Sequence, residues 1–80
     1  MKIITIKASY FDDHKRAHEY LAQRLHFPAY YGNNLDALAD CLSDLPRDTG
    51  IIILAENFGE YSEDFIETFV DVLGERVYVI

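Results

Sequence analysis

Three short stretches of the chain are apolar or β-branched at nearly every position, and they constrain the fold more than any other feature. They span residues 2–7, 51–55 and 76–80. Such runs predict strands that are buried on both faces, as in a parallel sheet, because a strand with one wet face alternates apolar and polar residues. Parallel neighbours need long crossover connections, and these are usually helical.

The segments between these runs carry helical periodicity. We expect a first helix over residues 13–26, a second from 33 or 34 up to Pro46, and a third after Ser62. The end signals are residues favoured at helix boundaries: Asp12 or Asp13, Asn33 or Asn34 and Ser62 as N-caps, Pro46 as a stop, and Gly74 just past an end. The predicted fold is α/β, a small three-stranded parallel sheet packed with about three or four helices, in one domain over residues 1–80.

The chain is acidic, with 7 Lys and Arg against 14 Asp and Glu and a formal net charge of −7. Phosphate backbones and anionic lipids repel such a chain, so we expect no direct binding to nucleic acid or membranes. The single cysteine, Cys41, excludes an internal disulfide and suits a reducing cytoplasm. No stretch resembles a signal-peptide core or a membrane span. We expect a cytoplasmic protein that is monomeric when free.

The charge is distributed unevenly along the chain. Residues 1–32 hold five basic and three acidic side chains, whereas residues 33–80 hold two basic and eleven acidic ones. The acidic part also contains two of the three apolar runs, which a disordered acidic tail would lack. The sequence therefore predicts a folded acidic face.

The segment after Asn34 predicts a helix with a dry side and an acidic side. The leucines of one side are Leu35, Leu38, Leu42 and Leu45, and the aspartates opposite them are Asp36, Asp40 and Asp44. Any amphipathic helix needs a polar side, and an aspartate near the N-terminus suits the helix dipole. Asp40 and Asp44 fit that explanation less well, because like charges at i,i+4 repel by about 0.2–0.5 kcal/mol and Asp44 meets the negative end of the dipole. A partner-binding role is therefore favoured.

The third expected helix repeats this pattern more weakly. Glu63, Glu67 and Asp71 recur at i, i+4 and i+8 opposite its apolar side. The acids near its N-terminus are favourable partners of the helix dipole, so a simple solvated face explains them well. That explanation fits Asp71 least well, because Asp71 lies near the C-terminal end of the expected helix.

Two tyrosines and the cysteine lie beside the acidic helix. Tyr30 and Tyr31 fall in a turn, and exposed tyrosine next to charge is common at protein interfaces. Adjacent side chains in a turn rarely bury together, so we expect one tyrosine to pack inward and the other to stay available. Cys41 falls on the flank of the helix, where we expect it to pack rather than react.

Two sets of residues have metal-ligand chemistry, but neither predicts a site. His14 and His18 are one helical turn apart, yet no third ligand follows at a recognised spacing, and we expect both at the surface. The three aspartates lie along one helix rather than converging, and no phosphate-binding Gly-rich loop accompanies them. We therefore expect no metal, no cofactor and no catalytic residue.

Residues 27–42, which read FPAYYGNNLDALADCL, resemble the signature of the barstar family of intracellular ribonuclease inhibitors. The order of the expected strands and helices outside this segment is compatible with that fold. The resemblance implies that the segment blocks the active site of a barnase-like extracellular ribonuclease in a 1:1 complex, with its helix standing in for the RNA phosphates. A carboxylate ridge on a rigid helix can occupy a pocket of Arg, Lys and His without offering a bond to cleave.

The resemblance also implies which residues contact the partner. Asp40 is implied as the central phosphate mimic, with Asp36 as a second acidic contact. Tyr30 would pack on the nuclease and Asn34 would make a polar contact. The full implied set is Tyr30, Asn34, Asp36, Ala39, Asp40, Ser43, Asp44, Leu45 and Asp71, the last as a third acidic contact from the later helix.

The chain departs from the family pattern at two kinds of position. Ala39 and Leu45 stand where the family has tryptophans, and residues 43–46 replace a Gly-containing turn. The loss of aromatic contact area and the added charge of Asp44 imply a cognate enzyme that is more basic than barnase and different in shape.

Two other classes of function stay open. The same acidic face could neutralise a basic protein that is not a ribonuclease, such as a DNase-type toxin. A small acid-dependent hydrolase would need two carboxylates flanking a cleft rather than a ridge on a convex helix. A deep pocket holding Asp36 and Asp40 would favour that enzyme. The leading hypothesis is a cytoplasmic ribonuclease inhibitor.

Overall fold

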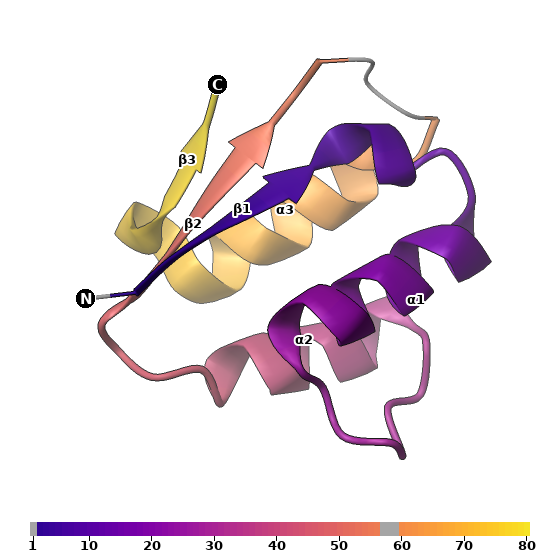
Figure 1. Cartoon of the computed structure of the whole chain (residues 1–80), viewed down its shortest axis with the longest axis horizontal. Helices are drawn as coiled ribbons and strands as arrows, with labels where there is room; N and C mark the ends of the chain where they lie inside the picture. Colours follow the sequence, from indigo (N-terminus) through magenta and orange to yellow (C-terminus); the bar gives the residue numbers. More distant parts are fainter. Residues whose placement is uncertain (1, 57–59) are drawn as a thin grey trace.

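The computed structural model describes residues 2–56 and 60–80 as three strands, three α-helices and two single 3₁₀ turns (Figure 1). In chain order these are β1 (Lys2–Lys7), η1 (Ala8–Tyr10), α1 (His14–Leu25), α2 (Leu35–Ser43), β2 (Thr49–Leu54), α3 (Ser62–Leu73), η2 (Gly74–Arg76) and β3 (Val77–Val79). No helix in the described part of the chain is both long enough and apolar enough to cross a membrane.

The strands form one sheet in the order β1-β2-β3, and both pairs are parallel. Ile51, in the central strand, pairs with Ile4 on one side and Val77 on the other. The predicted α/β class and the three-stranded parallel sheet are therefore confirmed.

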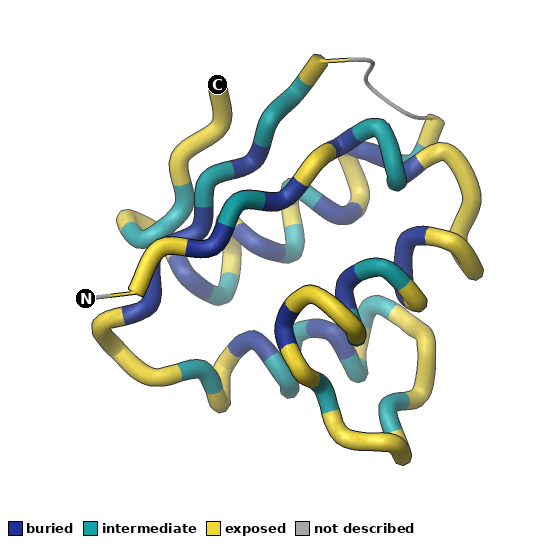
Figure 2. The backbone as a smooth tube through the Cα atoms, in the orientation of Figure 1, coloured by how far each residue is buried: buried dark blue, intermediate teal, exposed yellow. Residues whose placement is uncertain are grey.

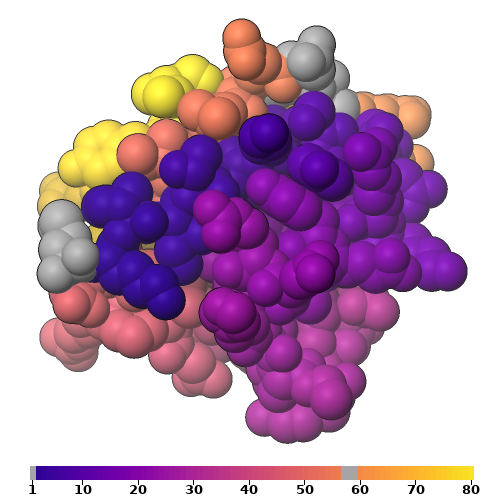
Figure 3. All heavy atoms as spheres, viewed as in Figure 1, coloured from indigo at the N-terminus to yellow at the C-terminus, as the bar shows by residue number. Residues whose placement is uncertain are grey.

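The sheet is buried on one face only, which corrects the prediction of strands covered on both sides. The buried face carries Ile4, Ile6, Ile51 and Ile53, which share one core with side chains of α1, α2 and α3. On the other face Ile3 is 50% exposed and Tyr78 is 61% exposed. Figure 2 shows this alternation along β1, and in Figure 3 atoms of all three strands lie next to one another at the surface.

The reason for one-sided burial is the small number of elements. The three helices pack around a single core, and α2 packs directly on α3, so they shield one side of the sheet. A run of apolar residues indicates that a strand is at least partly buried, but it does not indicate which elements cover each face of the sheet. Ile52 and Leu54, which share the outer face with Ile3, are therefore only half-buried.

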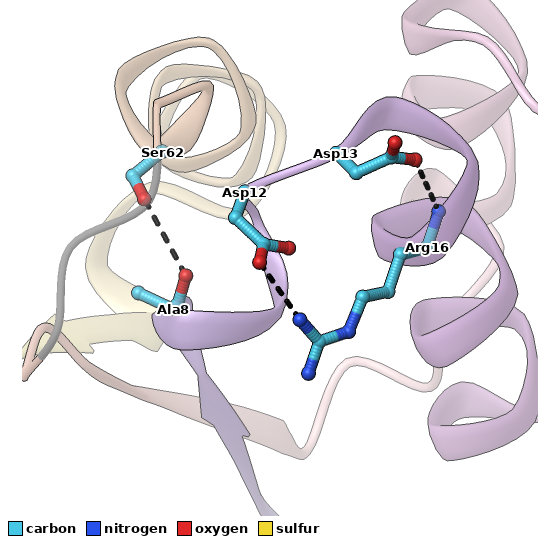
Figure 4. Close-up of polar contacts among 5 residues, drawn as sticks. All are labelled: Ala8, Asp12, Asp13, Arg16 and Ser62. Atoms are coloured by element: carbon cyan, nitrogen blue, oxygen red, sulfur yellow. Dashed lines mark hydrogen bonds and ion pairs between the residues drawn. The ribbon is translucent and has the colours of Figure 1, made fainter.

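The starts of α1 and α2 follow the predicted capping chemistry. The Asp13 carboxylate accepts a hydrogen bond from the backbone N–H of Arg16 at 3.0 Å, and Asp12 pairs with the Arg16 guanidinium at 2.7 Å (Figure 4). Asn34, rather than Asn33, caps α2. Asn33 instead adopts a left-handed conformation with φ of 53°.

Two predicted helix boundaries are wrong. Ser62 is the first residue of α3 and not its cap, because its side chain is fully buried and its hydroxyl points to the Ala8 carbonyl oxygen at 3.5 Å (Figure 4). The second helix ends at Ser43, and Leu45 lies beyond it. The backbone N–H of Leu45 still donates to the Leu42 carbonyl at 3.1 Å, which tightens the chain before Pro46.

Truncating isoleucines on the two faces of β1 should have unequal effects. Ile6→Ala removes a fully buried side chain, and we expect the free energy of unfolding to fall by about 2–5 kcal/mol. Ile3→Ala, the matched control on the same strand, removes a half-exposed side chain and should cost no more than about 1.5 kcal/mol. Urea unfolding followed by circular dichroism measures both. Equal losses would contradict one-sided burial.

Candidate functional site

The acidic side of α2 is positioned by the leucines on its opposite side. Leu38 and Leu42 are fully buried in the core. The side chains of Asp36, Asp40 and Asp44 are all exposed. Residues of a helix advance by a fixed angle, so burying the two leucines directs these carboxylates to solvent.

The three carboxylates of α2 and its C-cap have no polar partner in the part of the chain that the structure describes. Among the residues that the structure describes, none of them makes an ion pair or accepts a hydrogen bond. Within residues 2–56 and 60–80, therefore, no ion pair offsets the repulsion between neighbouring turns. Asp44 occupies the C-cap of α2, where the helix dipole also disfavours a negative charge.

The entry into α2 is ordered by the Asn34 side chain. Its Oδ1 accepts a hydrogen bond from the backbone N–H of Ala37 at 2.7 Å, and its Nδ2 donates to the Gly32 carbonyl at 3.3 Å. A Cβ built on Gly32 would lie 3.3 Å from that Nδ2 and 3.5 Å from the Ala37 Cβ, so the turn and the helix are closely packed. Asn34 thus ties the tyrosine-bearing turn to the acidic helix.

Of the two adjacent tyrosines, one packs inward and the other is exposed, as predicted. Tyr31 points inward, and its hydroxyl lies 2.6 Å from Nδ1 of His18. Burial, and secondarily the neighbouring Cys41, raises the pKa of Tyr31 well above its usual value. Tyr30 is 87% exposed and remains available to a partner.

His18 is buried, which corrects the prediction that both histidines lie at the surface. It is only 1% exposed, and its Nε2 is buried without a hydrogen-bond partner. Burial, with a smaller contribution from the nearby His14, lowers the pKa of His18. His18 falls at i, i+3 and i+7 with Leu21 and Leu25 on the buried side of α1, a spacing that could have indicated its burial.

A cavity of about 230 Å³ lies beside the acidic side of α2. One wall comes from the segment after α1, and includes Phe27, Pro28 and Tyr30, residues that periodicity alone could not place next to α2. The other wall comes from Asp40, Cys41, Asp44 and Leu45. Burial, then Asp44 and Asp40, raises the pKa of the half-buried Cys41 thiol, which disfavours the reactive thiolate.

The remaining residues expected at the site fall in different surroundings. Ala39 and Leu45 are half-buried, so neither is freely exposed. Ser43 is exposed, but its hydroxyl donates to the Asp40 carbonyl at 2.7 Å. Asp71 is exposed on α3, a helix that packs on α2, and it does not line the cavity.

Metal-ligating chemistry is not gathered in one place. Within residues 2–56 and 60–80, no three side chains among His, Cys, Asp and Glu are grouped so that they could hold a metal ion. The rings of His14 and His18 are 6.2 Å apart, and His18 is already bonded to Tyr31. The arrangement is one row of exposed carboxylates, Asp36, Asp40 and Asp44, beside a cavity.

Comparison with known proteins identifies the family. The model of the family described as Barstar (barnase inhibitor) matches residues 1–78. The chain belongs to the barstar family. A curated relative from Bacillus subtilis (strain 168), named "Putative ribonuclease inhibitor YrdF", is 39% identical over an alignment of 80 positions that covers 96% of this chain and 82% of that protein. The relationship of this barstar-family chain therefore extends far beyond residues 27–42.

Acidification should destabilise this barstar-family chain through His18. Its pKa is lower in the folded than in the unfolded state, so the unfolded chain takes up the proton first. The contribution of His18 to the free energy of unfolding is therefore fully present above its unfolded pKa of about 6.5. As the pH falls below that value, the free energy of unfolding decreases by up to about 1.4 kcal/mol per pH unit. We expect His18→Gln to reduce this slope and His14→Gln to retain it. Urea unfolding between pH 7.5 and about 5.5 measures the slopes. An unchanged slope in His18→Gln would refute the attribution of this acid destabilisation to His18.

Neutralising Asp44 should stabilise the free protein. Asp44→Asn removes a negative charge from the C-terminal end of α2 and its repulsion with Asp40, so we expect the free energy of unfolding to rise by about 0.3–1 kcal/mol. Asp36→Asn is the matched control, because it removes a charge that the N-terminal end of the dipole favours. Thermal unfolding of the two variants at low salt gives the comparison. A less stable Asp44→Asn variant would contradict the electrostatic cost.

Proposed function

We propose that this chain is an intracellular inhibitor of a barnase-like extracellular ribonuclease and that it masks the nuclease active site with the acidic side of α2. The observation that carries the proposal is the row of exposed carboxylates at Asp36, Asp40 and Asp44, none with a partner in the described part of the chain. Family membership supports a ribonuclease inhibitor, as does the printed name of the relative.

The proposed mechanism is electrostatic and steric masking without chemistry. A ribonuclease must hold the phosphates of RNA with Arg, Lys and His side chains, and a row of carboxylates can take the place of those phosphates. A helix backbone placed across the pocket presents no phosphodiester bond to cleave. The proposed partner is one basic nuclease molecule per inhibitor, and the proposed location is the cytoplasm of the cell that makes the nuclease.

The proposed contacts differ in what they supply. Asp40 is the central phosphate mimic, because it lies midway between Asp36 and Asp44 along the ridge and also lines the cavity. Tyr30 supplies an exposed aromatic ring. Asn34 contributes mainly by positioning, because its Oδ1 and Nδ2 already bond within the chain.

The outer members of the proposed surface extend it in two directions. Ala39, Ser43 and Leu45 surround the carboxylates at the C-terminal part of α2 and just beyond it. Asp71 adds an exposed carboxylate from α3. A partner that reaches Asp71 must extend past α2 onto the neighbouring helix.

A hydrolase is less well supported than an inhibitor. The pair that would have favoured an enzyme was Asp36 and Asp40 in one deep pocket. Asp40 lines the cavity, but Asp36 is not among its lining residues. A basic DNase-type toxin is the second candidate partner, since its active site would present the same positive charge to this ridge.

Asp40→Ala should weaken inhibition while leaving the fold intact. Removing an exposed carboxylate from the centre of the interface should cost about 2 kcal/mol or more of binding free energy, which is about thirtyfold in affinity. RNA cleavage by purified barnase-like ribonucleases, titrated with each variant, measures the inhibition constant. Glu75→Ala is the charge-matched control, because Glu75 is exposed beside the outer sheet residues Ile3 and Tyr78.

Two results would count against the proposal. If Asp40→Ala inhibits as tightly as the parent, the acidic ridge is not the binding surface. If the parent inhibits none of these ribonucleases but inhibits a basic DNase, the second candidate partner replaces the first.

A further inference from the structure

We propose that the cavity beside α2 is a seat for one arginine side chain of the partner and that Asp44 makes the seat selective for a cation. The identity of the partner as a basic nuclease rests on the proposed function above. The seat itself rests on the shape and charge of the cavity.

The walls of the cavity combine apolar surface with two carboxylates. Leu25, Phe27 and Pro28 supply apolar atoms and His26 an imidazole ring, whereas Asp40 and Asp44 supply negative charge. Its volume of about 230 Å³ lies below the range of roughly 300–1,000 Å³ that is usual for small-molecule sites. A single long side chain with an aliphatic stem and a charged end matches this combination.

Charge decides which kind of side chain the cavity favours. Asp40 and Asp44 are one helical turn apart, a spacing that places Cβ atoms about 5–6 Å from each other. Neither carboxylate has an ion pair in the part of the chain that the structure describes. Both also contribute to the raised pKa of Cys41, so their negative field reaches the cavity wall. A cation that enters relieves this repulsion, whereas a neutral side chain leaves it in place.

The geometry of the lining favours arginine over lysine. A guanidinium is planar, donates in several directions and can bond two separate carboxylates at once. Tyr30, which lines the cavity and is 87% exposed, offers an aromatic ring on which a guanidinium can stack. An ammonium group is more strongly hydrated and lacks the planar surface for stacking.

The test is a titration of the isotope-labelled full chain with N-acetyl-arginine methylamide, followed by NMR at pH 7.5. We expect saturable shifts of the Tyr30, Cys41 and Asp44 amides, with a dissociation constant on the order of 10 mM for so small a probe. The citrulline analogue has the same planar shape without the charge and should produce no saturable shift. The lysine analogue should bind several times more weakly than the arginine one.

Two charge-neutralising variants test the role of Asp44. We expect Asp44→Asn to weaken binding of the arginine probe about threefold to fivefold. Glu75→Gln carries the same change of charge outside the cavity and the acidic ridge, and it should leave the affinity within about twofold, because exposed charges at a distance are screened. Both variants keep the buried leucines of α2, so both should fold.

Each possible result bears on the seat separately from the ribonuclease assay. Equal binding of the citrulline probe, equal loss in the two variants, or no saturable shift with arginine would overturn the seat, even if ribonuclease inhibition is found. Selective arginine binding that Asp44→Asn weakens would support the seat, even if no ribonuclease is inhibited, and the partner would then be another basic protein.

Discussion

The burial of Leu38 and Leu42 determines which way α2 faces, and the proposed binding surface depends on that orientation. Burying two leucines stabilises a fold by about 3–6 kcal/mol, whereas repulsion between neighbouring aspartates costs about 0.2–0.5 kcal/mol per pair. Packing therefore prevails, and the carboxylates stay on the solvent side in an arrangement that electrostatics alone would not favour. The helix presents a rigid row of charges because its other side is part of the core.

The turn before α2 is held by polar contacts in addition to the packing of Phe27 and Tyr31 against the core. His18 contacts Tyr31 from α1, and Asn34 joins the turn to the first residues of α2. Because Tyr31 is held inward, its neighbour Tyr30 is left exposed beside Asp40. A surface already ordered in the free protein loses less conformational entropy on binding, so in the proposed complex these internal contacts would favour affinity without touching the partner.

Local sequence signals predicted the elements, whereas contacts between distant segments could not be read from them. Periodicity and capping placed the first helix at residues 13–26, within one residue of α1 at each end. The two-sided burial of the strands was wrong because an apolar run does not reveal how many helices are available to cover a sheet. The acidic residues of α2 were found from spacing alone. The cavity could not be predicted because residues 25–30 and 40–45 are distant in the sequence and come together only in the folded chain.

The half-buried Ala39 and Leu45 shift the proposed interface towards charge. Residues of this size and burial cannot supply the large contact area of an exposed tryptophan, so Tyr30 is the main aromatic group left on this side. Electrostatic complementarity contributes to association rate and choice of partner more than to affinity. An inhibitor that relies on positioned carboxylates therefore gains selectivity for a nuclease whose cations match their spacing. The net charge of −7 opposes direct contact with nucleic acid. The acidic residues gathered on α2 and α3 instead suit contact with a partner protein whose own active site binds nucleic acid.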